Sequence, residues 1–125
     1  MKMDIKNQSY GDVLVVSPVG RIDHATTEDF RSSLGRFVDR CRKGGESLIL
    51  DLAGIDYVSS AGLRSFMLAN KQAKTQGGVI VVAAMQPVVK EIFEISRFTL
   101  IFQTFDDVRG AIDSLSIAQP KTRQS

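Results

Sequence analysis

The spacing of apolar positions changes several times along the chain, and each change marks an expected element. Near the N-terminus, residues 5–10 predict a weak strand at a sheet edge, and the β-branched run 13–16 predicts a stronger one. Gly11 and Asp12 form the expected turn between them. Proline lacks the N–H that a strand ladder needs, so we expect the second strand to end or bulge near Pro18.

A polar loop over residues 20–26 leads into an amphipathic helix that we expect to run to about Arg42. Thr26 or Thr27 is the expected N-cap, because acidic residues follow in the first turn. The apolar stripe of this helix, at helical spacing, comprises Phe30, Leu34, Phe37, Val38 and Cys41. The pair Gly44-Gly45 is expected to end the helix.

The most informative stretch runs from residue 47 to residue 68. It opens with a continuous apolar run, Leu48-Ile49-Leu50, which ends in Asp51-Leu52 and predicts a strand buried on both faces. A short loop that turns at Gly54 follows, and then a helix from about Ala61 to Thr75. The expected inward face of this helix comprises Leu63, Phe66, Met67, Asn70 and Ala73. Ser59 and Ser60 therefore lie at a helix start beside the carboxyl edge of a sheet, where open α/β folds place their functional groups.

Gly77-Gly78 ends the second helix, and residues 79–83 predict another buried strand. Pro87 fits the first turn of a third helix, and residues 100–102 predict a short last strand. The third helix is expected to turn Val88, Ile92 and Ile95 inward, with Phe93 beside them. A final helix capped by Asp106 is expected to turn Val108, Ala111, Ile112 and Leu115 inward. We expect residues 1–115 to form one domain and residues 116–125 to form a disordered tail.

The order of these elements predicts an α/β fold. Strands that alternate with helices indicate a mixed, mostly parallel sheet of about five strands with about four helices. The opening pair of strands adds an antiparallel edge.

Composition excludes several classes of function. The net charge is +2, but Lys121 and Arg123 lie in the last ten residues, which contain no acid. Without these two bases, the 16 basic residues become 14, equal to the 14 acidic ones. The chain has no basic cluster with interleaved aromatic residues, so nucleic-acid binding is not expected.

The longest apolar run, residues 79–85, is too short to span a bilayer, so direct membrane insertion is not expected either. No apolar segment typical of a signal peptide follows the first residues, which favours a cytoplasmic location. The single cysteine, Cys41, excludes an internal disulfide framework and is expected in the core.

Three segments resemble one family. The central segment I-L-D-L-A-G-I-D-Y-V-S-S-A-G-L-R resembles the signature of the STAS domain, which bacterial anti-sigma factor antagonists share. The loop G-R-I-D-H-A-T resembles the matching G-x-[LI]-D segment, and V-I-V-V-A-A-M-Q-P-V-V-K-E-I-F-E-I-S-R-F resembles the later strand, Pro-led helix and aromatic turn. The similarity covers about residues 4–115. It implies the STAS fold and an activity of binding, not catalysis.

The resemblance also implies a mechanism. In the family, an unphosphorylated antagonist binds an anti-sigma factor that is also a serine kinase, which releases a sigma factor. The kinase then phosphorylates the antagonist on one serine, the complex dissociates, and a metal-dependent serine phosphatase reverses the modification. Alignment on Gly62 and Leu63 places that serine at Ser60. The motif D-S-[ST]-G-L has an Asp where this chain has Ser59, which leaves Ser59 as an alternative acceptor.

A partner-binding surface is expected around these serines. Residues four apart share a helix face, so Ser60, Arg64 and Leu68 form a row, with Lys71 beside it. With the facing loop, the expected surface comprises Asp23, His24, Thr26, Ser59, Ser60, Arg64 and Leu68. We expect the chain to be a monomer or a weak dimer.

Other interpretations remain open at this point. Both serines are also good helix caps. The chain is alternatively a STAS scaffold that is not phosphorylated, or an accessory subunit of a membrane lipid transporter. An enzyme is not expected, because the sequence shows no general base, nucleophile pair or Gly-rich phosphate loop. No cofactor is expected, and His24 has no companions at ligand spacing, so no metal site is expected.

Overall fold

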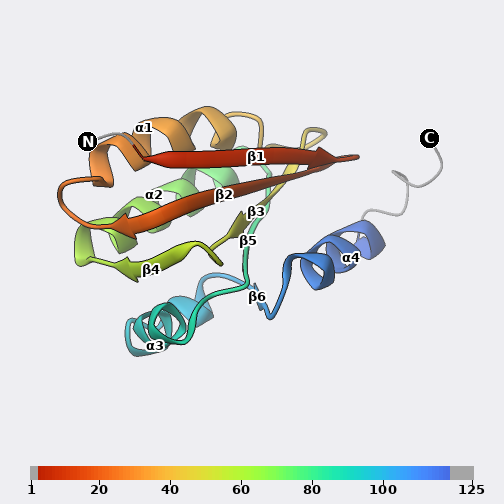
Figure 1. Ribbon diagram of the computed structural model, residues 1–125. Coiled ribbons are helices and arrows are strands. Elements are labelled where there is room, and N and C mark those ends of the chain that lie inside the picture. The colour runs from red at the N-terminus through yellow and green to blue at the C-terminus, as the bar shows by residue number, and fades with distance from the viewer. Residues whose placement is uncertain (1–2, 119–125) are drawn as a thin grey trace.

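A computed structural model of the chain, in which residues 3–118 are described, has a six-stranded mixed sheet (Figure 1). The sheet order is β1-β2-β3-β5-β6, and β4 pairs separately with β2. The strands are β1 (Asp4–Tyr10), β2 (Val13–Ile22), β3 (Ser47–Asp51), β4 (Ile55–Val58), β5 (Ile80–Ala83) and β6 (Thr104–Phe105). Only β1 and β2 pair antiparallel, and every other pair among the described strands is parallel. The predicted α/β class and antiparallel edge are confirmed.

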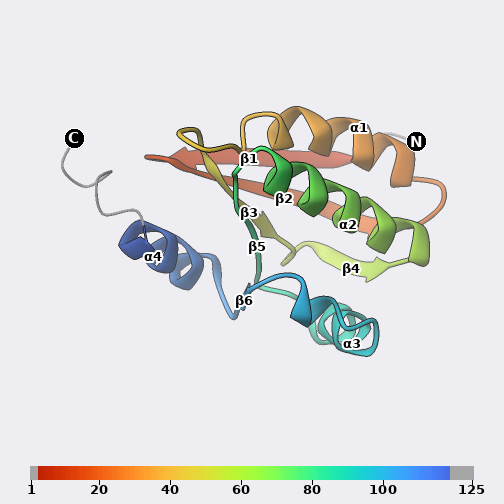
Figure 2. The same ribbon diagram turned by 180° about the vertical axis from the view of Figure 1, so that it is seen from behind.

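The helices form layers on both faces of this sheet (Figures 1 and 2). The described elements are α1 (Thr27–Val38), α2 (Ser60–Thr75), α3 (Pro87–Ile95), the short 3₁₀ helix η1 (Phe98–Leu100) and α4 (Val108–Ala118). Helices α1 and α2 cover one face, α4 packs against the other, and α3 lies against β4. Within residues 3–118, no helix is both long enough and apolar enough to cross a membrane.

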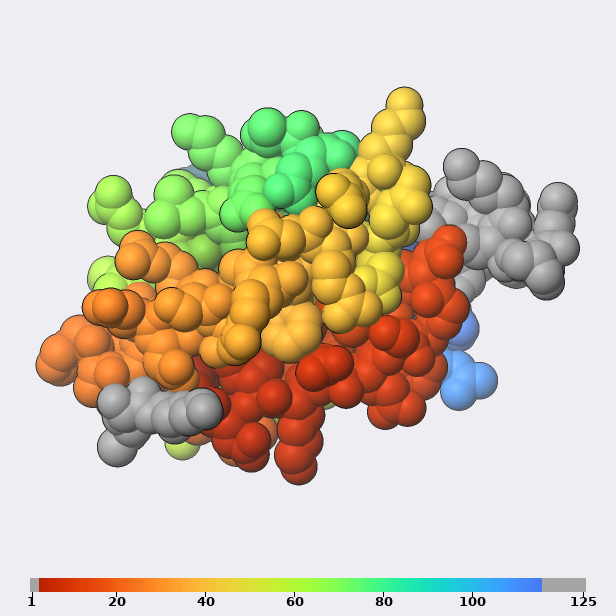
Figure 3. Space-filling model, turned by 90° about the horizontal axis from the view of Figure 1, so that it is seen from above, coloured from red at the N-terminus to blue at the C-terminus, as the bar shows by residue number. Residues whose placement is uncertain are grey.

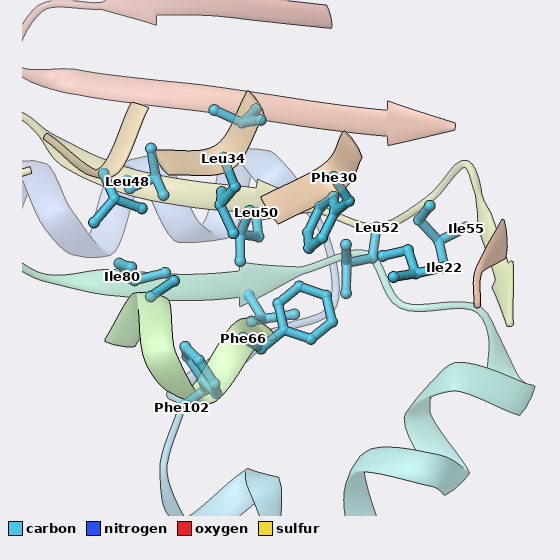
Figure 4. Packing of buried hydrophobic residues seen from close by; sticks show 14 of the residues in the cluster. Ile22, Phe30, Leu34, Leu48, Leu50, Leu52, Ile55, Phe66, Ile80 and Phe102 are labelled. Atoms are coloured by element: carbon cyan, nitrogen blue, oxygen red, sulfur yellow. The ribbon is translucent and has the colours of Figure 1, made fainter. Parts of the chain in front are cut away.

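Two hydrophobic cores explain why the central strands contain continuous apolar runs. Along β2, Leu14 and Val16 face the core under α1 and α2, whereas Val13 and Val15 face the core under α4. In the larger core, Phe66 of α2 lies between Phe30 and Phe102 (Figure 4). Its ring centroid is 5.4 Å from that of Phe30 in an edge-on arrangement. The aromatic contacts thus fix α2 against α1 and the C-terminal half of the domain.

Strand β2 continues past Pro18 to Ile22, so the expected end near Pro18 was wrong, but the alternative of a bulge near it agrees with the register shift between Gly20 and Arg21. The register with β3 stops at Val16, and the register with β4 starts at Gly20. Pro18 lies in the gap between these two neighbours, where no parallel strand is paired with it, and it is paired only with Ile5 of β1. Its missing N–H is tolerated because β2 exchanges partners there.

The segment after Gly54, expected to be a loop, contains strand β4. Ile55 and Val58 are buried, whereas Asp56 and Tyr57 between them are exposed. Four residues are too few to show a period, so the strand is defined by its long-range pairing with the end of β2.

The first helix ends at Val38, four residues before the expected end at Arg42. Cys41 therefore lies in the following turn and not on the helix stripe, although it is buried as predicted. Its Sγ donates a hydrogen bond to the carbonyl oxygen of Val79 at 3.1 Å. Burial raises the pKa of this thiol, and the nearby hydrogen bonds only partly offset that effect.

The prediction that Gly44-Gly45 ends the first helix was wrong, because α1 already ends at Val38. The second pair, Gly77-Gly78, packs closely against the turn that follows α1. A Cβ atom on Gly78 would lie 2.3 Å from the carbonyl oxygen of Cys41, and one on Gly77 would lie 2.9 Å from Cβ of Lys43. Gly77 also has a φ of +79°, which favours glycine. The second pair is thus required by close packing as well as by helix termination.

The C-terminal part departs from the prediction in three ways. Residues 100–102 do not form a strand, because η1 ends there and β6 begins at Thr104. Asp107, not Asp106, caps α4, since its carboxylate accepts the N–H of Gly110 at 2.7 Å. Helix α4 reaches Ala118, three residues into the expected tail, and residues 119–125 lie outside the described part.

Two predicted helix faces are rotated in the structure. On α2, Phe66, Asn70 and Ala73 are buried as predicted, but Met67 is 45% exposed and Ala69 is buried in its stead. On α3, Val89 and Phe93 point into the core, and Val88 and Ile95 are exposed. On α4, Ala111 and Leu115 are buried as predicted.

Candidate functional site

The loop after β2 and the start of α2 meet at one edge of the sheet. Strands β2 and β4 run in parallel, with Ile22 in register with Val58 near the end of each. The backbone N–H of Ser59 donates to the carbonyl oxygen of Ile22 at 2.8 Å. Both views place these two connections together, at the left in Figure 1 and at the right in Figure 2. The fold thus brings the Asp23 loop to the Ser59–Ser60 segment.

The two serines differ in what they do. Ser59 has an extended backbone and is the N-cap of α2, and its Oγ accepts the N–H of Gly62 at 3.2 Å. Ser60 is the first helical residue and is exposed. In the described part of the chain, no group forms a hydrogen bond with its hydroxyl, which is therefore free. The cap interpretation therefore applies to Ser59, and the Ser60 hydroxyl remains accessible.

Gly62 fixes how closely the first turn of α2 approaches the strand ends. A Cβ atom there would lie 2.7 Å from Cγ2 of Ile22 and 2.9 Å from Cγ1 of Val58. Both are buried branched side chains that have little room to move. Any residue larger than glycine would push the helix start, and with it Ser60, away from the sheet edge.

The carboxylate of Asp23 organises the facing loop. Its Oδ1 accepts the N–H groups of Ala25 at 2.9 Å and Thr26 at 3.3 Å, and its Oδ2 accepts from Nε of Arg21 at 3.1 Å. Partial desolvation acts to raise the pKa of Asp23, but these hydrogen bonds and the Arg21 charge together outweigh it and lower the pKa. The negative charge of Asp23 is therefore largely engaged in hydrogen bonds within its own loop.

Thr26 supports this loop from beneath. It occupies the N-cap position of α1, as predicted, but it forms no capping hydrogen bond with its side chain. Its hydroxyl instead donates to the carbonyl oxygen of Arg21 at 2.7 Å and accepts the N–H of Asp23 at 3.0 Å. Thr26 is only 6% exposed, whereas His24 is exposed. Of the two, His24 is placed to touch a partner.

The outer surface of α2 extends the site. Arg64 is exposed and Leu68 is 43% exposed. Leu68 also lines a groove of about 150 Å³ between α1 and α2, together with Arg31 and Leu34. Figure 3 shows the two helices side by side on this face.

Met67 is the surface residue that sequence reasoning missed. It lies seven residues, about two helical turns, after Ser60 and so on the same line of the helix. This spacing was a usable signal, but the apolar side chain led to its assignment to the core.

The site has no cluster of typical metal ligands. Among residues 3–118, no group of three or more His, Cys, Asp or Glu side chains is arranged to hold an ion. The chemistry that the arrangement offers is an accessible hydroxyl at a helix start, next to a braced acidic loop.

Comparison with known proteins identifies related chains. The family model of the STAS domain matches residues 4–111. BtrV of Bordetella bronchiseptica, provisionally named an anti-sigma factor antagonist, is 35% identical over 109 residues, which cover 87% of this chain and 91% of that protein. An anti-sigma F factor antagonist of Paenibacillus polymyxa is 24% identical over 117 residues, covering 94% and 98% of the two chains.

A solved structure has the same fold. The anti-sigma-factor antagonist (STAS) domain protein from Planctomyces limnophilus superimposes with a TM-score of 0.80 at 17% sequence identity. The match covers 91% of this chain and 98% of that one. The predicted STAS fold is therefore confirmed.

Proposed function

We propose, because this chain belongs to the STAS domain family, that it is an anti-sigma factor antagonist switched by phosphorylation of Ser60. The unphosphorylated form binds an anti-sigma factor that is also a serine kinase, and a sigma factor is released. Phosphorylation of Ser60 by that kinase reverses the binding, and a metal-dependent serine phosphatase restores the active form. The protein itself acts by binding and not by catalysis.

The observation that supports Ser60 as the acceptor is the division of roles between the two serines. A kinase needs a hydroxyl that it can reach and that is not already used as an acceptor of a structural hydrogen bond. Ser60 is exposed with a free hydroxyl, whereas Ser59 is half-buried and holds the N–H of Gly62. Modification of Ser59 would remove the helix cap, and modification of Ser60 would not.

A phosphate on Ser60 is compatible with the fold. It adds about −1.5 to −2 charges at neutral pH, and negative charge is favoured at a helix N-terminus. The first turn of α2 contains no acidic residue that would repel the phosphate. The modification therefore leaves the domain folded, and its effect falls on the partner, which meets a charged group where a neutral hydroxyl had been.

The partner-binding surface combines the loop and the helix. We assign it to Asp23, His24, Ser59, Ser60, Arg64 and Leu68, with Thr26 as the buried support of the loop. Asp23 contributes mainly by holding the loop, since both of its carboxylate oxygens are engaged.

The decisive experiment is intact-mass analysis with site mapping on the protein purified from its own cells. We expect one phosphate, on Ser60, and its loss in the variant Ser60→Ala. The Ser59→Ala variant is the matched control and should keep the phosphate. Ser60→Ala should retain the anti-sigma factor in a pull-down, whereas Ser60→Asp should not.

A second candidate is a STAS scaffold that is not phosphorylated, or an accessory subunit of a membrane lipid transporter. Ser59, which stands where the phosphorylated motif has Asp, favours it. Absence of phosphate under all growth conditions, with Ser60→Asp binding the same proteins as the wild type, would replace the first proposal by this one.

A further inference from the structure

The charges on α2 all have the same sign. The helix contains Arg64, Lys71 and Lys74 and no acidic residue from Ser60 to Thr75. All three cations are exposed, and none of them forms a salt bridge with a described residue of the chain. By contrast, α1 carries acids in its first turn. Because the domain is balanced as a whole, this positive charge is a local property of one helix surface.

Apolar side chains lie among these cations. Met67 is 45% exposed and Leu68 is 43% exposed. At 3.6 residues per turn, Ser60, Arg64, Met67 and Lys71 lie within about 60° of one another around the helix axis. Leu68 follows at the edge of this sector, towards the groove with α1. The phosphoacceptor proposed above thus belongs to a surface that is both basic and apolar.

We propose that this surface of α2, which comprises Ser60, Arg64, Met67, Leu68, Lys71 and Lys74 and is called the α2 face below, docks an acidic surface of the anti-sigma factor. The partner surface places apolar side chains on Met67 and Leu68 and carboxylates opposite the three cations. This docking mode rests on the proposed function and adds the chemistry of the partner to it. Charge complementarity of this kind increases the rate of encounter more than the final affinity.

A protein surface fits the α2 face better than the other acidic partners. Protein surfaces that bind nucleic acids combine a larger basic footprint with aromatic side chains for stacking, and the α2 face has neither. Anchoring on a lipid surface needs a longer apolar helix face than two half-exposed residues. Two apolar contacts surrounded by cations are typical of a protein interface with a polar rim.

The same surface explains how one phosphate reverses binding. A charge of about −1.5 to −2 at Ser60 offsets half or more of the three positive charges on the α2 face. Ser60 is also one turn from Arg64, which is well placed to pair with the phosphate and is then withdrawn from the partner. An acidic partner surface would meet repulsion at the point where it had been attracted.

The test is the association rate of the unphosphorylated protein with the purified anti-sigma factor, measured by stopped flow between about 0.02 and about 0.5 M salt. We expect the rate to fall about tenfold or more over this range. The double variant Lys71→Gln/Lys74→Gln should lower the low-salt rate by about three- to tenfold and flatten its salt dependence. The control is Lys6→Gln/Arg109→Gln, which removes two exposed charges from β1 and α4 and should leave the rate close to that of the wild type.

Each outcome separates the two proposals. If the anti-sigma factor binds with a rate that neither salt nor the Lys71/Lys74 variant changes, the acidic docking mode is wrong and the proposed function stands. If it does not bind at all, the proposed function itself fails. Binding of phosphatidylglycerol vesicles that the Lys71/Lys74 variant abolishes, without an effect on the anti-sigma factor, would assign the α2 face to a membrane instead. Met67→Ser should accelerate dissociation and leave the salt dependence of association unchanged.

Discussion

The backbone N–H of Ser59 and the carbonyl oxygen of Ile22 are 2.8 Å apart, and this hydrogen bond joins the start of α2 to the end of β2. The residue after Ile22 is Asp23, whose carboxylate braces the facing loop. The residue after Ser59 is Ser60. The two halves of the candidate site are therefore coupled through backbone atoms, and changes that move one half should move the other.

Where α2 meets the end of β2, the packing is tightest around Gly62. We expect Gly62→Ala to destabilise the protein by about 1–3 kcal/mol. The new Cβ would lie 2.7 Å from Ile22, so the helix start must shift. Denaturant unfolding measures the loss. The control is Gly35→Ala in α1, where nothing lies within 4 Å of the added atom and helix propensity favours alanine by about 1 kcal/mol. Equal effects of the two substitutions would contradict the packing role of Gly62.

Substitutions at Ser59 and Ser60 should differ in their effects on stability, because the two side chains make different contacts in the structure. Ser59→Ala removes the helix cap and should cost about 0.5–2 kcal/mol, whereas Ser59→Asp should retain most of the cap. Ser60→Ala removes an exposed hydroxyl without a partner and should change stability by less than about 0.5 kcal/mol. Thermal unfolding of the three variants decides this. A cost for Ser60→Ala as large as that for Ser59→Ala would show that the capping role is shared.

The lowered pKa of Asp23 predicts a stability difference that depends on pH. Because the folded-state pKa lies below the unfolded-state value of about 4, the contribution is fully present above pH about 4 and is lost as pH falls through the lower folded-state pKa. The difference in unfolding temperature between wild type and Asp23→Asn should therefore shrink in acid. Arg21→Gln should raise the pKa of Asp23 in an NMR titration, and an unchanged value would exclude the Arg21 contact as a cause.

Leu68 tests the proposed partner surface directly. Leu68→Glu places a negative charge on the α2 face and should weaken binding of the anti-sigma factor at least tenfold. Ile95→Glu is the matched control, because Ile95 is an even more exposed apolar residue, 76% against 43%, but lies on α3. Isothermal titration calorimetry with both variants distinguishes the two surfaces. Loss of binding in Ile95→Glu with intact binding in Leu68→Glu would move the interface to α3.

Much of the fold was predictable because strongly apolar runs dominate its centre. Strand β3 contains the continuous apolar run Leu48-Ile49-Leu50 and is buried on both faces there, as expected. Strand β4 was not predictable, because four residues define no period and its pairing depends on the far end of β2. The expected end of β2 at Pro18 was wrong for a related reason, since only the three-dimensional arrangement shows that β2 changes partners there.

The candidate site was predictable in its parts but not in its details. Strand order and motif spacing were enough to bring Asp23 near Ser59 and Ser60. The orientation of α2 was not, because its inward face is set by Gly62 and Ala69, small residues that let the helix approach the sheet closely. Hydrophobicity ranks Met67 above both, although it is the larger side chain that remains outside. Ser59 and Ser60 are likewise the same residue type, so the sequence does not distinguish their roles. The hydrogen bond between Ser59 and Gly62 does.

The second pKa of a phosphate on Ser60 should depend on the charge of Arg64. A free phosphoserine has a second pKa of about 6, and a cation one helical turn away favours the doubly charged form and lowers that pKa. Phosphoserine installed at position 60 during translation makes the test independent of any kinase. We expect ³¹P NMR to give a second pKa below 6 in the wild-type background and a higher value after Arg64→Gln.

The matched control for this titration is Arg36→Gln, which removes an exposed cation from the last turn of α1, at the other end of that helix from the Asp23 loop. A general effect of net charge would shift the second pKa of the phosphate equally in both variants, because each loses one positive charge. A shift confined to Arg64→Gln identifies local pairing, which falls off with distance and is screened by salt. Equal shifts would instead mean that the phosphate remains in solvent and that Arg64 stays available to a partner.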